Sequence, residues 1–353
     1  MSVATKQGLI PTFGRHETFT PRYAWLKRGY DAVADPNYVD DRQALSGGYI
    51  FNDDDAHHRL GVGKNQARSI RFWLQAFRLV EERKVPGTRS LYGDPTVFGQ
   101  ALLDDKSGLD PYLEDQGTWW VLHWMALSPG GYLPAWWAAF HTFQPVEFTV
   151  DQLVEHVQGQ VDATSAWHQP KTPHTGTVKK DVLALLRAYA GTSGSRRKDT
   201  LDDDLDSPLV PLTLLRETEE PGRFRFGIGP KPGLPPTVAA FACLDYLSRT
   251  GHTARTALVA TLANEQGAPG RALKLTERDL GQLLSDAAEE VPELLTMAAA
   301  DGRGDILSVR SDENLGHVAA KVLWAGYHRR GVACPEPEMA YLPSDLYKLG
   351  EWT

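Results

Sequence analysis

Three consecutive residues near the start of the chain, Arg15, His16 and Glu17, could carry out chemistry at a phosphate group. A histidine beside a carboxylate can activate water or bind a metal ion, and an arginine can hold a phosphate. Arg22 offers a second phosphate clamp. We therefore predict His16, Glu17 and Arg15 as catalytic residues, with Glu17 also a metal ligand. The alternative is the start of a helix, in which Glu17 satisfies backbone and arginine partners.

A second cluster consists of the carboxylates Asp110, Glu114 and Asp115, in the segment GLDPYLEDQGTWW. Carboxylates within one turn can hold Mg²⁺. The alternative is a helix N-terminus, where the helix dipole favours negative charge. We predict these three residues as a reserve metal site, with Mg²⁺ or Mn²⁺ as the cofactor.

The segment GVGKNQARSIRFWLQAFRLVEE, residues 61–82, has the pattern of an amphipathic helix. Gly61 and Gly63 favour a turn, Asn65 can cap a helix, and we expect the helix to run to about Val80. At about 100° per residue, the apolar side chains share one face. The opposite face carries polar side chains at steps of three and four: Lys64, Arg68, Arg71, Gln75 and Arg78.

The residues after this helix have the layout of a β-hairpin, with a Pro-Gly turn at 86–87 and a second turn at 93–95. Helix, turn, basic helix and hairpin is the order of a winged helix-turn-helix. Between Arg59 and Arg89 the chain has eight Lys or Arg residues and two acidic residues. Lys and Arg would contact DNA phosphates, and Gln75 would read adenine; the alternative is a solvated helix face. The remaining predicted DNA contacts are also basic: Arg22, Lys27, Arg28 and Arg89.

The elements that must position these groups indicate a mostly α (α+β) fold with several domains. We predict a winged-helix DNA-binding domain over 1–105, a tryptophan-rich helical domain over 106–190, a linker over 191–208 and a C-terminal α+β domain over 209–353. Within the last of these, Pro236 suits a helix start and DILSV could close a second winged-helix-like unit. Half of the ten tryptophans lie between 119 and 137. Their helical spacing favours a packed core over stacking on unpaired bases.

The composition excludes several classes of protein. The chain has 353 residues and a net charge of −8, and its only cysteines, Cys243 and Cys334, support neither a disulfide framework nor a zinc cluster. No stretch approaches the roughly 20 apolar residues of a membrane span, and the N-terminus lacks the apolar core of a secretory signal. We therefore expect a cytoplasmic protein with no membrane partner. The negative net charge does not exclude nucleic-acid binding, because basic residues are concentrated between Arg59 and Arg89.

Five stretches together resemble a known bacterial family: GRHETFTPRYAWLKRGYD, LGVGKNQARSIRFWLQAFRLV, GLDPYLEDQGTWWVLHW, VKKDVLALLRAY and FRFGIGPKPGLPP. This family is described as a domain of unknown function, and its members are encoded beside sulfur-transfer proteins similar to phosphoadenosine phosphosulfate reductase. The resemblance spans most of the chain. It further suggests the DNA-nicking component of the Ssp DNA phosphorothioation systems, which defend bacteria against phage.

The resemblance implies an endonuclease that nicks one strand of double-stranded DNA, so that a partner can install sulfur in the backbone. Its implied partners are a cysteine desulfurase, an ATPase and an ATP-pyrophosphatase-like sulfur carrier. It brings no catalytic residues with it. The sequence also leaves open a non-catalytic winged-helix recruiter or regulator of these partners, and a homodimer is expected because winged-helix proteins often pair.

Overall fold

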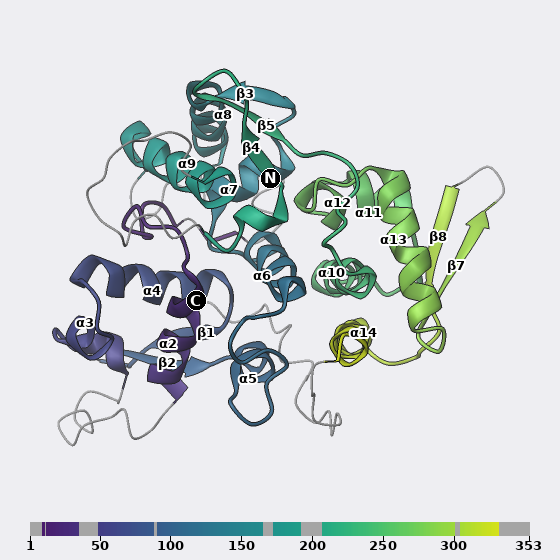
Figure 1. Ribbon diagram of the computed structural model, residues 1–353, viewed down its shortest axis with the longest axis horizontal. Coiled ribbons are helices and arrows are strands. Elements are labelled where there is room, and N and C mark those ends of the chain that lie inside the picture. Colours follow the sequence, from purple (N-terminus) through teal and green to yellow (C-terminus); the bar gives the residue numbers. More distant parts are fainter. Residues whose placement is uncertain are drawn as a thin grey trace.

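The computed structural model describes residues 9–10, 12–34, 49–87, 90–164, 172–191, 207–300 and 304–331. Figure 1 shows helices as the main elements, together with small sheets at separate places in the molecule. Each of the three sheets within the described ranges is antiparallel and has two or three strands. The predicted mostly α (α+β) fold is therefore confirmed.

The N-terminal part contains α2 (Tyr23–Ala34), the 3₁₀ turn η3 (Ile50–Asn52), α3 (Ala56–Arg59), α4 (Lys64–Ala76) and the hairpin β1 (Val80–Lys84) and β2 (Leu91–Pro95). Helices α2 and α4 pack together closely at Gly29, where a Cβ atom would lie 2.5 Å from a methyl group of Ile70. The apolar face expected of α4 is buried, including Trp73 and Leu74. The order of helices and hairpin agrees with the expectation, and the winged-helix interpretation of this part stays a prediction.

Two local features differ from the expectation. Helix α4 ends at Ala76, because Arg78 has the left-handed backbone conformation (φ 58°) and its guanidinium turns back into the molecule. The expected second turn at 93–95 lies instead inside strand β2. Gly93 fits there because the ring of Tyr49 packs 2.0 Å from the position of an added Cβ atom.

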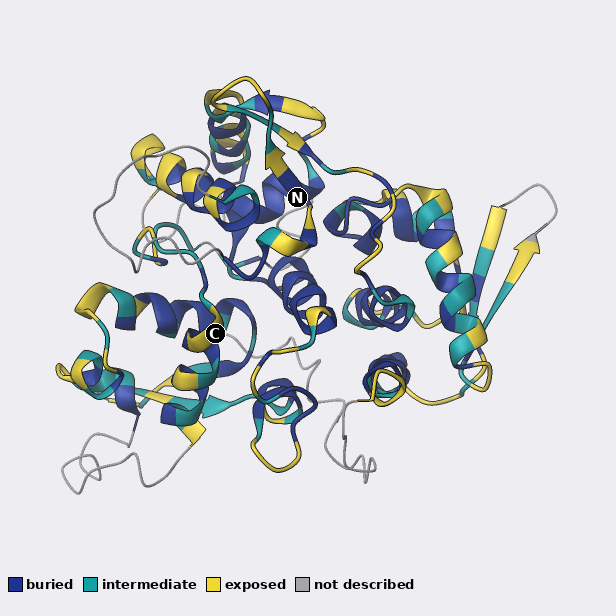
Figure 2. Cartoon of the chain, in the orientation of Figure 1, coloured by how far each residue is buried: buried dark blue, intermediate teal, exposed yellow. Residues whose placement is uncertain are grey.

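The centre of the molecule is formed by α5 (Val97–Leu103), α6 (Gln116–Leu127) and α7 (Pro134–His141). All residues of α7 are buried, as are those of α6 from Gly117 onward, and Figure 2 shows these helices almost entirely dark blue. The predicted core role of the tryptophans is confirmed, since each lies within the core with at most 3% of its surface exposed: Trp119, Trp120, Trp124, Trp136 and Trp137.

The rest of the chain repeats one connectivity, although the sequence shows no repeat. After α7 come β3 (Glu147–Thr149), α8 (Val150–Ala163), α9 (Thr175–Ala190), η5 (Val210–Leu212), β4 (Leu215–Glu217) and β5 (Arg223–Phe226). Next come α10 (Pro236–Arg249), β6 (Thr256–Leu258), α11 (Val259–Asn264), α12 (Pro269–Ala272), α13 (Glu277–Glu290), β7 (Leu295–Ala300) and β8 (Gly304–Val309). The strand orders β3-β5-β4 and β6-β8-β7 match, because the first strand pairs with the last in both. Each unit therefore runs helix, strand, two or three helices and hairpin.

The last helix of the described residues is α14 (Leu315–Arg329), which packs along α10. One large buried apolar cluster extends from Leu9 to Tyr327, and a small second cluster packs around η3 and α3. The predicted linker at 191–208 falls mostly outside the described residues, and the predicted domain boundaries stay predictions. No helix within the described ranges is both long enough and apolar enough to cross a membrane.

Candidate nucleic-acid interface

The segment Gly14–Phe19 is fixed to the molecule through His16, whose side chain is only 2% exposed. Its Nε2 lies 2.7 Å from Oδ1 of Asp181 in α9, and its Nδ1 accepts a 3.0 Å hydrogen bond from the backbone amide of Thr18. Because Nδ1 is an acceptor, the ring proton is assigned to Nε2 and is donated to Asp181. The ring also contacts Phe72 and Trp73 of α4. One histidine therefore joins this segment to both α4 and α9.

The two residues after His16 have an unusual backbone. Glu17 and Thr18 have φ values of 50° and 68°, in the left-handed region that non-glycine residues rarely occupy. The carbonyl of Thr18 accepts a 2.7 Å hydrogen bond from Arg187 of α9, and Oε1 of Glu17 lies 3.7 Å from the guanidinium of Arg68 of α4. Arginines from both helices thus reach the same short turn.

Exposed cations lie on both helices and on the turn between them. Helix α4 exposes Lys64 and Arg68 near its N-terminus, and α9 exposes Lys179, Lys180 and Arg187. Arg15 on the connecting segment is also exposed. Lys179 lies 3.1 Å from Asp151, a carboxylate whose side chain is 85% exposed. We call this set the α4–α9 surface: Arg15, Lys64, Arg68, Lys179, Lys180 and Arg187.

Two predicted DNA contacts on α4, Arg71 and Gln75, have partners within the protein instead. Arg71 binds both carboxylate oxygens of Glu82 in strand β1, at 2.6 and 2.7 Å. Tyr49 donates to the same carboxylate, and burial raises the pKa of its hydroxyl, which therefore stays protonated. The amide of Gln75 donates to the carbonyl of Arg71. The contacts of Glu82 with Arg71 and Tyr49 fasten the hairpin to α4.

Arg78 has a similar internal role at another place. Its guanidinium donates to the carbonyls of Met125, Ser128 and Pro129, at distances between 2.6 and 3.1 Å. These carbonyls end α6 and begin the following turn, where no intrahelical donors remain. Arg78 therefore caps a helix far away in the sequence, and its charge is turned away from α4.

Of the other residues predicted to contact DNA, three have partners within the protein and one lies outside the described ranges. The guanidinium of Arg22 lies 4.9 Å from the centre of the Trp25 ring. Lys27 pairs with Asp31 and Asp105. Arg28 is exposed and donates to the carbonyl of Leu60 at 3.0 Å, whereas Arg89 lies outside the described residues.

The predicted carboxylate metal site does not fit a metal ion. Asp110 accepts hydrogen bonds from the amides of Glu114 and Asp115 and from the hydroxyl of Thr118. Asp115 caps α6 through Gly117 and binds Arg330 with its other oxygen. Their oxygens are thus committed to the helix N-terminus, as in the alternative interpretation. Within the described ranges no group of three or more His, Cys, Asp or Glu side chains could hold a metal ion.

The sequence reasoning did not identify α9 as part of a functional surface. Its motif VKKDVLALLRAY contributed only to the family resemblance, although Lys180 and Arg187 are about two helical turns apart and share a face, with Lys179 next to Lys180. That spacing was a usable signal. The contact of Asp181 with His16 had no such signal, because 165 residues separate the two.

Comparison with known proteins gives a consistent result. A family model described as "Protein of unknown function (DUF4007)" matches residues 13–327. A solved structure described as "Magnesium ion-bound SspB crystal structure" is 31% identical, with a TM-score of 0.81, and the match covers 98% of this chain and 94% of that chain. A second, described as "SspB crystal structure", is also 31% identical, with a TM-score of 0.78 and coverage of 96% and 97%. No curated protein matches.

Proposed function

Because the chain belongs to the DUF4007 family and is similar to SspB over almost its whole length, we propose that it is the DNA-binding component of a phosphorothioation system. The resemblance seen in the five sequence motifs is thereby confirmed at the level of the family. The proposal places duplex DNA on the α4–α9 surface. In this arrangement the duplex lies against two helices and the strained turn between them.

The observation that carries the proposal is the position of α9 together with its charge. Within the described residues, α9 is the last α-helix before the hairpin β4–β5, with only the 3₁₀ turn η5 between them. The second helix of a helix-turn-helix is the one that enters the major groove. Here that helix exposes Lys179, Lys180 and Arg187. In the second unit the corresponding helix, α13, has the sequence ERDLGQLLSDAAEE, which is acidic. Only the first unit is therefore proposed to bind the duplex.

The electrostatics of the surface are compatible with DNA despite the net charge of −8. Phosphate contacts from Lys and Arg supply much of the affinity of DNA-binding proteins and do not depend on base sequence. Two acidic residues, Glu17 and Asp151, each lie close to one cation of the surface. Arg187 donates to the carbonyl of Thr18, whereas Arg15, Lys64 and Lys180 are exposed and are proposed to contact phosphates.

Nicking of one strand is the activity that the resemblance implies, and we propose it as the second part of the function. Both nitrogens of His16 have partners, so His16 is better suited to positioning the turn than to activating water. Of the three predicted catalytic residues, Arg15 and Glu17 are the ones whose side chains reach solvent. Mg²⁺ or Mn²⁺ stays a prediction without an assigned site, and we derive no step through it.

The proposed partners follow from the same assignment. A component of a phosphorothioation system would work with a cysteine desulfurase, an ATPase and an ATP-pyrophosphatase-like sulfur carrier, as the sequence resemblance implies. A homodimer is also proposed. Co-purification with each partner and the mass of the protein in solution test these two points.

The proposed function is tested by incubating purified protein with supercoiled plasmid, with and without Mg²⁺ or Mn²⁺. Gel retardation reports binding, and conversion to open circles reports nicking. Binding with nicking supports both parts of the proposal, whereas binding alone leaves a recruiter of the sulfur-transfer partners. The absence of both binding and nicking would contradict the proposal.

A further inference from the structure

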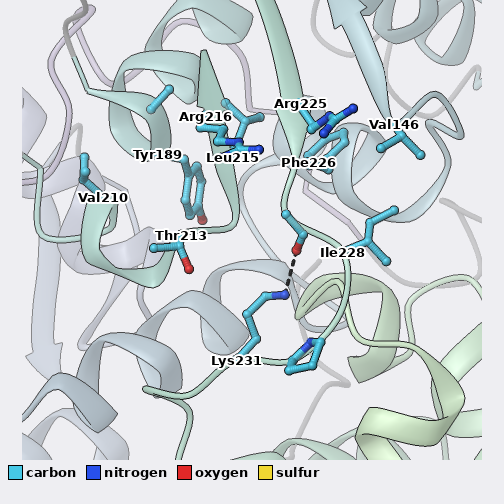
Figure 3. A pocket seen from close by; sticks show the side chains of 13 residues that line it. Val146, Tyr189, Val210, Thr213, Leu215, Arg216, Arg225, Phe226, Ile228 and Lys231 are labelled. Atoms are coloured by element: carbon cyan, nitrogen blue, oxygen red, sulfur yellow. Dashed lines mark hydrogen bonds between the residues drawn. The ribbon is translucent and has the colours of Figure 1, made fainter. Parts of the chain in front are cut away.

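A pocket of about 740 Å³ lies beside the hairpin β4–β5, away from the predicted catalytic and metal-binding residues. Figure 3 shows Arg216 and Arg225 at one end of it and Lys231 at the other. Tyr189 and Ala190, the last two residues of α9, line the wall between them. Pockets of roughly 300–1,000 Å³ are the usual size for small organic ligands.

The arginine end of the pocket carries an excess of positive charge. Arg216 and Arg225 are direct partners across strands β4 and β5, so that their side chains extend from the same face of the sheet. Glu147 is the partner of Arg225 on the other side and forms an ion pair with it. Like charges directly opposite one another disfavour a sheet. One carboxylate offsets two guanidinium groups here, which favours binding of an anion.

The remaining lining is apolar and partly open to solvent. Val146 and Ile228 are 46% and 52% exposed, so apolar surface at the pocket is in contact with solvent. Phe226 also lines the pocket and is itself buried, and its backbone amide donates to the carbonyl of Val146. A ligand with an apolar ring would cover this surface, while its anionic group reached the arginines.

The floor of the pocket is held in a fixed shape by Lys231. Its Nζ donates to the carbonyls of Gly227 and Gly229, both at 2.6 Å, and the side chain is buried. Thr213, also in the lining, has a left-handed backbone (φ 53°). A third acceptor is the carbonyl of Lys274, at 3.4 Å. Because Lys231 donates to backbone carbonyls, it shapes the pocket and the arginines are left to bind the anion.

We propose that this pocket binds a phosphorylated nucleoside, with the phosphate on Arg216 and Arg225 and the base over Val146 and Ile228. Arginine pairs recognise phosphate oxygens through paired, charge-assisted hydrogen bonds. The ligand has two chemical sources: a free nucleotide, or an unpaired nucleotide of DNA. An unpaired nucleotide could come from DNA bound nearby, because the pocket lies at the end of α9. At about 1.5 Å per residue, that end is roughly 15 Å along the helix from Lys180. The proposal does not depend on duplex binding by the α4–α9 surface.

The test measures the affinity of the full-length protein for three probes by calorimetry: ATP, a short single-stranded oligothymidylate and inorganic pyrophosphate. Each probe is titrated into the wild type, Arg216→Glu, Ile228→Ser and the control Arg310→Glu. Arg310 is an exposed arginine beyond strand β8, in the other unit. Circular dichroism confirms that each variant is folded.

We expect Arg216→Glu to weaken binding of the preferred nucleotide probe about tenfold or more, because a charge-assisted contact is lost. Ile228→Ser should weaken it less, and Arg310→Glu should leave it unchanged. A preference for ATP identifies a free nucleotide, and a preference for the oligonucleotide identifies an unpaired DNA residue. The proposal is overturned if Arg216→Glu binds ATP and the oligonucleotide as the wild type does, or if the wild type binds neither of these two probes. It is also overturned if the wild type binds pyrophosphate as tightly as it binds ATP or the oligonucleotide.

Discussion

The imidazole Nε2 of His16 and the carboxylate Oδ1 of Asp181 lie 2.7 Å apart in the interior of the protein, although 165 residues separate them. Asp181 also accepts a hydrogen bond from the backbone amide of Gly14. The pair holds the turn at Glu17 and Thr18 between α4 and α9. It therefore determines how the α4–α9 surface is assembled, without itself reaching solvent.

Replacement of His16 distinguishes a positioning role from a catalytic one. We expect His16→Ala to lower the free energy of unfolding by about 1–3 kcal/mol, because Asp181 loses a buried partner. Chemical denaturation measures this change. The exposed Arg15→Ala is the control and should unfold as the wild type does. A stable His16→Ala protein that had lost only nicking would instead favour the original catalytic prediction.

Arg71 should behave as a structural residue, in contrast to Arg68. Lysine keeps the charge but cannot form the paired hydrogen bonds to Glu82. We expect Arg71→Lys to lower stability by about 1–2 kcal/mol and to leave affinity for DNA nearly unchanged in the folded protein. Arg68→Lys should change neither quantity. If Arg71→Lys has normal stability and weaker DNA binding, the predicted phosphate contact is right and the internal role is minor.

The carboxylate cluster at α6 should respond to mutation as a helix cap. Asp110→Ala removes acceptors for two backbone amides and the Thr118 hydroxyl, and we expect a loss of about 1–3 kcal/mol in stability. Glu114→Ala, at an exposed position, serves as the control. Thermal unfolding with and without Mg²⁺ completes the test. Stabilisation by Mg²⁺ that disappears in Asp110→Ala would show that the cluster binds metal after all.

The buried Lys274 predicts a dependence of stability on pH. Burial lowers its pKa from 10.5 to about 7, even though Nζ donates to the carbonyl of Phe140 at 2.7 Å. Between pH 7 and 10 the unfolded chain therefore binds more protons than the folded one, so stability rises with pH by up to about 1.4 kcal/mol per unit. Lys274→Met should lack this contribution. Denaturation at several pH values compares it with wild type and with Lys106→Met, and parallel curves for Lys274→Met and wild type would contradict the prediction.

Local patterns in the sequence predicted the elements of the fold better than the contacts between them. The pattern of residues alone identified α4, the buried tryptophans of α6 and α7, and the presence of a hairpin after α4. It could not show that Arg71 binds Glu82 in β1, or that Arg78 caps α6, because each partner is set by tertiary packing. An ideal helix predicted one stripe of five polar side chains. The contact of Arg71 with Glu82 and that of Arg78 with the end of α6 take two of these side chains out of the stripe.

The repeated connectivity of the two later units was also out of reach of the sequence. Strands β3 and β6 have only three residues each, too few for a pattern of alternation. Their pairing with β5 and β8 becomes visible only in the sheets. The pairing of β4 with β5 is what identifies α9 as the α-helix before a hairpin, and hence as part of a candidate DNA-binding surface.

The most direct test of the account is duplex DNA affinity measured by fluorescence anisotropy over a range of salt concentrations. Three proteins are compared: the wild type, Arg68→Ala/Lys180→Ala on the α4–α9 surface, and Lys106→Ala/Arg310→Ala, which removes the same charge elsewhere. If each removed residue contacts one phosphate, the salt slope of the first variant falls by about two and the control keeps the wild-type slope. Equal slopes and affinities for all three folded proteins would contradict the proposal that the α4–α9 surface binds DNA.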